Sequence, residues 1–117
     1  MEFFSQLANL FACTGRDENR LRKGMAHAHA KRPAQAIAVY DSLLNGGGIN
    51  PTVKARALFN RALAHSLMKD DQKAIADLEE VVSMSAAPEN VLSAARNQLV
   101  RVHNRVRRVR DRAAQQA

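Results

Sequence analysis

The sequence predicts an all-α fold, a short superhelix of about five helices packed in antiparallel pairs. Residues 35–44 (QAIAVYDSLL) recur as residues 73–82 (KAIADLEEVV) at an offset of 38 residues, and residues 24–27 recur as residues 62–65 at the same offset. Each copy has apolar residues at helical spacing and is bounded by proline, glycine or a capping residue. A fixed offset in this range is typical of stacked repeat proteins.

The composition fits one small domain or a short repeat array of 117 residues. The net charge is +7, and residues 96–117 carry +6 of it, so the body is nearly neutral and the tail is basic. No apolar run approaches the roughly 18 residues that a membrane span needs. The single cysteine, Cys13, excludes an internal disulfide, and a cytoplasmic location is expected.

Residues 1–14 are predicted to form an amphipathic capping helix that ends at Gly15, because glycine can terminate a helix. A helix of this length is not stable alone, so it must dock on the first repeat, in the groove or on a partner chain. A membrane surface is the weaker alternative, because the polar face has no Lys or Arg before Arg16. The first repeat spans residues 17–45, where Pro33 ends one helix and opens the next. The glycine run at residues 46–48 then forms a flexible turn.

The second repeat is predicted over residues 51–84. Asn50 is the expected N-cap of its first helix, with Pro51 at the first helical position. Asp70 or Asp71 is expected to cap its second helix.

A long basic capping helix is predicted over residues 88–113, because Pro88 can start a helix and neither glycine nor proline follows it. Its apolar residues recur at spacings of three and four, which is typical of a packing seam. The second half of the seam extends past the helix that it caps. It is predicted to pack within the chain or to form a seam with a second copy or a partner, through Leu99, Val102, Val106 and Val109.

These patterns resemble the tetratricopeptide repeat family, whose repeats are paired antiparallel helices with small residues where the helices cross. Gly24 and Ala62 match the small residue of the first helix, and Ala36 and Ala74 match that of the second. The resemblance covers two degenerate repeats over residues 17–84, followed by a solitary C-terminal helix.

The small residues have a physical role, because the side chains between two helices set how closely the axes approach. Gly24 is expected to face Ala36, and a large side chain there would overpack the core at a cost of about 1–3 kcal/mol. The chain departs from the family pattern at Lys23 and Arg61, which stand where leucine is common.

The resemblance implies a non-enzymatic protein–protein interaction module or adaptor, in which the first helices line a concave groove. That groove would take a protein or peptide partner as an extended segment or a helix. The residues carried over to it are Leu21, Arg22, Met25, His29, Phe59, Asn60, Leu63 and Ser66. The alternatives are a homo-oligomeric scaffold, including a homodimer, built on the C-terminal helix, and a basic nucleic-acid-binding module.

A stripe of arginines on the last helix is a possible anion-binding surface: Arg101, Arg105, Arg108 and Arg112. Each arginine could release a counterion from a phosphate backbone. Nucleic acid is the weaker alternative, because no aromatic residue lies beyond Phe59 to stack on bases.

No catalytic residues, metal ligands or cofactors are predicted. Cys13 has no plausible base near it in sequence, and the glycine run lacks the lysine and hydroxyl residue of a phosphate-binding loop. His27 and His65 repeat at the 38-residue offset, but stacked helices are too far apart for the two rings to share a zinc ion. An enzyme is therefore not expected.

Overall fold

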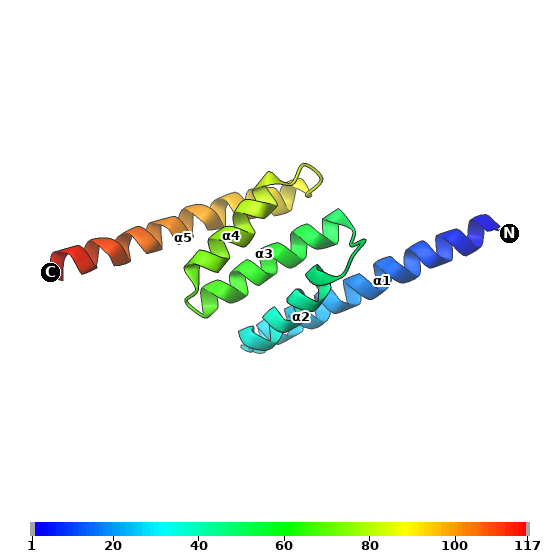
Figure 1. The fold of residues 1–117 in the computed structure, drawn as a ribbon, viewed down its shortest axis with the longest axis horizontal. Helices are drawn as coiled ribbons and strands as arrows, with labels where there is room; N and C mark the ends of the chain where they lie inside the picture. The colour runs from blue at the N-terminus through cyan, green and yellow to red at the C-terminus, as the bar shows by residue number, and fades with distance from the viewer. Residues whose placement is uncertain (1, 117) are drawn as a thin grey trace.

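The computed structural model describes the backbone of residues 2–116 and the side chains from residue 15 to residue 116. It consists of α-helices joined by short turns, which confirms the predicted all-α fold. The helices are α1 (Glu2–His29), α2 (Pro33–Asn45), α3 (Pro51–Leu67), α4 (Asp71–Ser83) and α5 (Glu89–Gln116). Successive helices pack side by side as antiparallel neighbours, with α3 in the middle of the molecule (Figure 1).

The helix boundaries of the second repeat follow from its capping residues. The side chain of Asn50 accepts a hydrogen bond from the backbone N–H of Thr52 at 2.8 Å, at the start of α3. Asp70, rather than Asp71, caps α4 by accepting from the N–H of Lys73 at 3.2 Å. These bonds satisfy helical N–H groups that have no partner within the helix itself.

Helix α1 is continuous through Gly15, so the predicted break there is wrong. Glycine in a helix interior costs only about 1 kcal/mol relative to alanine, which does not end a helix unless the backbone turns left-handed. The glycine with positive φ is Gly48, at +72°, in the turn between α2 and α3. The N-terminal half of α1 projects beyond α2 (Figure 1). The predicted docking of residues 1–14, Cys13 included, concerns side chains outside the described residues.

The two helix–turn–helix connections share one backbone conformation. Lys31 and Lys69 are 38 residues apart, and both have φ of 61°. The following residue donates to the carbonyl five residues back in each turn, from Arg32 to His27 and from Asp70 to His65, both at 2.9 Å. The 38-residue offset read from the sequence is therefore also the offset of the backbone geometry.

Two apolar clusters hold the helices together, and α3 contributes to both. The first cluster joins α1, α2 and α3 through Leu21, Ala36, Tyr40, Leu43, Val53 and Ala57. The second joins α3, α4 and α5 through Ala55, Leu58, Ala62, Ala74, Leu78, Val81, Ala87, Val91, Ala95 and Val102. Because α3 is buried on two opposite sides, a third side of this helix remains available at the surface.

Gly24 packs against the ring of Tyr40, four residues after Ala36, and the three atoms nearest to a Cβ at Gly24 all belong to that ring. A Cβ atom at Gly24 would lie 2.9 Å from both Cδ1 and Cζ of Tyr40, closer than carbon atoms pack. The ring cannot easily move, because Tyr40 is fully buried. Its hydroxyl has no hydrogen-bond partner among the described residues, and burial raises the pKa of Tyr40 to about 12.

We expect Gly24→Ala to destabilise the fold by about 1–3 kcal/mol, although alanine is the better helix former by about 1 kcal/mol. Gly15→Ala is the matched control, because Gly15 is also inside α1 and a Cβ there meets nothing within 4 Å. That variant should be as stable as the parent or up to about 1 kcal/mol more stable. Urea unfolding measures both. Two equal midpoints would contradict the close approach of Tyr40.

Candidate partner-binding groove

The residues predicted for the groove lie on α1 and α3, the first helices of the two pairs. Met25, Phe59, Asn60, Leu63 and Ser66 are half-buried, and Arg22 and His29 are exposed. Leu21 is only 5% exposed and belongs to the core cluster around Tyr40. Leu21 is therefore a core residue and not part of an open surface. A core residue and a groove residue can both lie four positions from Met25, so the sequence could not show which of the two Leu21 is.

We group Met25 of α1 with Phe59 and Leu63 of α3 as an apolar strip, because all three are partly exposed apolar residues on first helices that contact each other. Met25 packs against the first core cluster, and Phe59 packs against the second. All three keep part of their surface exposed, unlike Ala57 and Ala62 of α3, which are fully buried. The apolar strip is thus partly buried, and the rest of its apolar surface is exposed to solvent.

The polar residues near this strip are partly engaged within their own helices. Asn60 donates through Nδ2 to the carbonyl of Arg56 at 2.8 Å, which leaves its side-chain oxygen available. Arg22 lies 4.0 Å from Glu18 one turn earlier, and both side chains are well exposed. Such exposed pairs contribute little to stability, so the Arg22 guanidinium can exchange Glu18 for another acid at low cost.

The apolar face of α5 is largely core. Val102 is fully buried, and Leu99 and Val106 pack against the same cluster, whereas Val109 is 61% exposed. The predicted partner seam is therefore wrong at Val102, because α5 runs along α4 and covers the second repeat with this face. The C-terminal part of α5 projects past α4 (Figure 1), and Val106 is the last apolar residue of α5 that packs against the cluster.

The arginine stripe of α5 begins beside the groove. Arg105 donates through Nη2 to Asp71 Oδ1 at 2.5 Å and through Nε to Asp71 Oδ2 at 3.3 Å. The hydrogen bond with Asp71 raises the pKa of Arg105. Arg105 Nη2 also lies 3.4 Å from Ser66 Oγ, so this turn of α5 contacts the end of α3. Arg101, Arg108 and Arg112 are exposed.

A second charged cluster, which the sequence did not predict, centres on Arg61. Its Nη2 and Nε donate to the two carboxylate oxygens of Asp77, both at 2.8 Å, and its Nη1 donates to Asp41 at 2.9 Å. These bonds, led by the one to Asp77, raise the pKa of Arg61. Arg61 thereby ties α3 to both second helices. The sequence feature that could have indicated this cluster is the arginine at position 61, where the family commonly has leucine.

His65 completes this cluster. Its Nε2 lies 3.9 Å from Asp77, and burial lowers the pKa of His65 below its ordinary 6.5 although Asp77 acts in the other direction. His65 is therefore mostly neutral at pH 7. A cavity of about 310 Å³ opens beside the cluster, lined also by Ile37, Lys73 and Ala76. Because both Asp77 oxygens already accept from Arg61, the cluster acts as a structural clamp.

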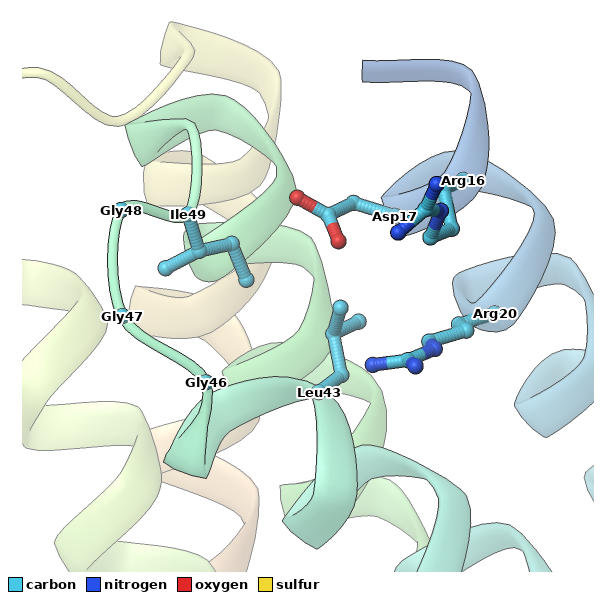
Figure 2. Close-up of a pocket in the computed structure, with 8 residues that line it drawn as sticks. All are labelled: Arg16, Asp17, Arg20, Leu43, Gly46, Gly47, Gly48 and Ile49. Carbon is cyan, nitrogen blue, oxygen red and sulfur yellow. The ribbon is translucent and has the colours of Figure 1, made fainter. Parts of the chain in front are cut away.

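Another cavity, of about 230 Å³, lies between α1 and the glycine turn. Figure 2 shows the side chains of Asp17 and Arg20 extending from α1 toward it, opposite Leu43 and Ile49. Gly46, Gly47 and Gly48 form its edge without side chains. Arg16 also lines this cavity, so its charged residues are two arginines and one aspartate, all on α1.

In the part of the chain that the structure describes, no three side chains of the His, Cys, Asp and Glu types gather to form a possible metal site. None of the helices in this part of the chain is both long enough and apolar enough to cross a membrane.

The fold and this surface define a short helical repeat protein, with antiparallel helix pairs stacked side by side. The family model described as Tetratricopeptide repeat matches residues 55–88, which run from α3 through α4. The match assigns this stretch to the tetratricopeptide repeat family and confirms the resemblance for the second predicted repeat. Counting back 38 residues from Ala55 gives Asp17, where the first repeat was predicted to begin. Comparisons with curated proteins and with solved structures give no significant match.

Proposed function

We propose that this chain is a non-enzymatic adaptor that holds a peptide or helix of a partner protein across α1 and α3. Tetratricopeptide repeats are in general protein–protein interaction modules, and residues 55–88 match that family. The observation that supports this surface most directly is the apolar strip of Met25, Phe59 and Leu63. All three remain half-exposed on adjacent first helices, although Met25 and Phe59 each pack against a buried core cluster.

The strip can supply a modest part of a binding energy. Full burial of one such side chain is worth about 1.5–3 kcal/mol, and roughly half of that remains when the side chain is already half-buried. Three of them would contribute about 2–4 kcal/mol, which alone corresponds to a dissociation constant of about 1 mM or weaker. Polar contacts must therefore add to the affinity and set the specificity.

The test uses the full chain and a display library of random peptides, followed by titration of the enriched peptides. Leu63→Ser should weaken binding about three- to tenfold, because it removes one half-buried apolar anchor of the strip, worth about 0.7–1.5 kcal/mol. Ile37→Ser is the matched control, since Ile37 is a half-buried aliphatic residue on α2 beside the Arg61 cluster. It should change affinity less than about twofold. Circular dichroism verifies that both variants stay helical.

Two results would count against the proposal. If the library yields no peptide that binds the chain, the adaptor function is not supported. If Ile37→Ser weakens binding as much as Leu63→Ser, the bound segment lies on another face of the molecule.

A further inference from the structure

We propose that the arginine stripe of α5 continues the groove, and that the partner segment carries three or four consecutive acidic residues beside its apolar anchor. The inference rests on the proposed function, because it names the chemistry of the segment that the groove would hold. The contact between Arg105 and Ser66 is the observation that connects the two surfaces.

The arginine stripe of α5 meets α3 close to the apolar strip. Ser66 lies one turn after Leu63 on α3, so Arg105 reaches α3 at the end of the apolar strip. Residues three and four apart lie on one face of a helix, which places Arg101 one turn before this contact and Arg108 one turn after it. The stripe therefore passes the end of the strip and continues along the projecting part of α5 (Figure 1).

The arginines of the stripe differ in whether an acidic side chain pairs with them. Asp71 neutralises Arg105, which leaves that side chain as a link between α5 and the body of the molecule. Arg101, Arg108 and Arg112 are exposed, and no acidic side chain among those described lies within 4.0 Å of them. A row of unpaired guanidinium groups favours carboxylates, which each can bind through two parallel hydrogen bonds.

The spacing of the arginines sets the length of the acidic run. Arg101 and Arg108 are seven residues apart, which is about 10 Å along the helix axis at roughly 1.5 Å per residue. An extended peptide covers that distance in about three residues at roughly 3.3 Å each. Three or four successive acidic residues can therefore reach both arginines.

A protein segment fits this surface better than a nucleic acid. The stripe meets α3 at Ser66, one turn after Leu63, so the best ligand joins an apolar group to a run of anions. Nucleic-acid surfaces of this kind usually add aromatic side chains on which bases stack, and α5 has no Phe, Tyr or Trp.

The experiment compares two display libraries of peptides of about sixteen residues, random except for a central run of four glutamates in one and four glutamines in the other. Against the unmodified chain, glutamate peptides should bind at least tenfold more tightly than their glutamine counterparts. Arg101→Gln with Arg108→Gln should abolish that preference. Arg107→Gln with Arg110→Gln removes the same charge from the other flank of α5 and should preserve it to within about twofold.

The outcomes separate the two proposals. Peptides that bind equally well with glutamate or glutamine would overturn the acidic run and leave the adaptor function in place. Binding from neither library would remove both. A duplex DNA or a single-stranded RNA serves as a competitor in the same titration. If either binds more tightly than the glutamate peptides, and loses that binding in the Arg101 and Arg108 variant, the stripe is a phosphate-binding surface and the inference is wrong.

Discussion

Replacing Val102 by aspartate should unfold the chain. Val102 is fully buried in the cluster that joins α3, α4 and α5. The substitution loses about 1.5–3 kcal/mol of apolar burial and places a carboxylate without a partner in the core, at a cost of several kcal/mol more. The sum approaches the roughly 5–15 kcal/mol that stabilises a typical domain. Loss of the helical circular dichroism signal at 25 °C is the expected result.

Val109→Asp is the matched control for this substitution. Val109 lies two turns further along α5 and is 61% exposed, so the aspartate stays in water. Its effect on the free energy of unfolding should be within about 0.5 kcal/mol. If the Val102 variant instead stays folded and its mass in solution falls, Val102 belongs to an interface between copies and not to the core.

Arg61→Ala should be the second most damaging substitution. It removes the partner of Asp77, whose side chain is 8% exposed, and it cuts the link from α3 to α2 and α4. Breaking a buried pair costs about 3–5 kcal/mol, and the 21% exposure of Arg61 reduces this to about 2–4 kcal/mol. Arg56→Ala, an exposed arginine on the same helix, should change stability by less than about 0.5 kcal/mol.

A double variant tests whether the stability lost in Arg61→Ala comes from leaving the Asp77 carboxylate without a partner. Arg61→Met with Asp77→Leu removes both charges and fills the space with apolar groups, which is often neutral or stabilising. We expect it to recover most of the stability lost in Arg61→Ala, as measured by urea unfolding. If the double variant is less stable than the single one, the hydrogen bonds themselves stabilise the fold and the charge argument fails.

The helix boundaries from Pro33 onward could be predicted because their causes are local. A proline at a first helical position and an asparagine or aspartate as N-cap act within a few residues of themselves. The break predicted at Gly15 was wrong because a glycine alone does not decide where a helix ends. A glycine is compatible with both a helix end and a helix interior, and the choice is made by the backbone around it.

The candidate site was less predictable, because its roles depend on which helices become neighbours. Leu21 and Met25 are both apolar residues at helical spacing, and only the packing of α2 on α1 separates the core residue from the surface one. The same holds for Val102, which α4 covers. Arg61 contacts acids 16 and 20 residues away, and no local pattern encodes such a pairing.

The long reach of α5 gives the molecule a mechanical lever. Gln116 lies about 15 Å beyond Val106, the last apolar residue of α5 that packs against the core, at roughly 1.5 Å per residue. A tilt of about 10° at Val106 would therefore displace the far end of α5 by about 3 Å. The ion pair between Arg105 and Asp71 lies beside this pivot and joins α5 to the start of α4. Breaking this one contact would therefore loosen the direction of the whole projecting part of α5.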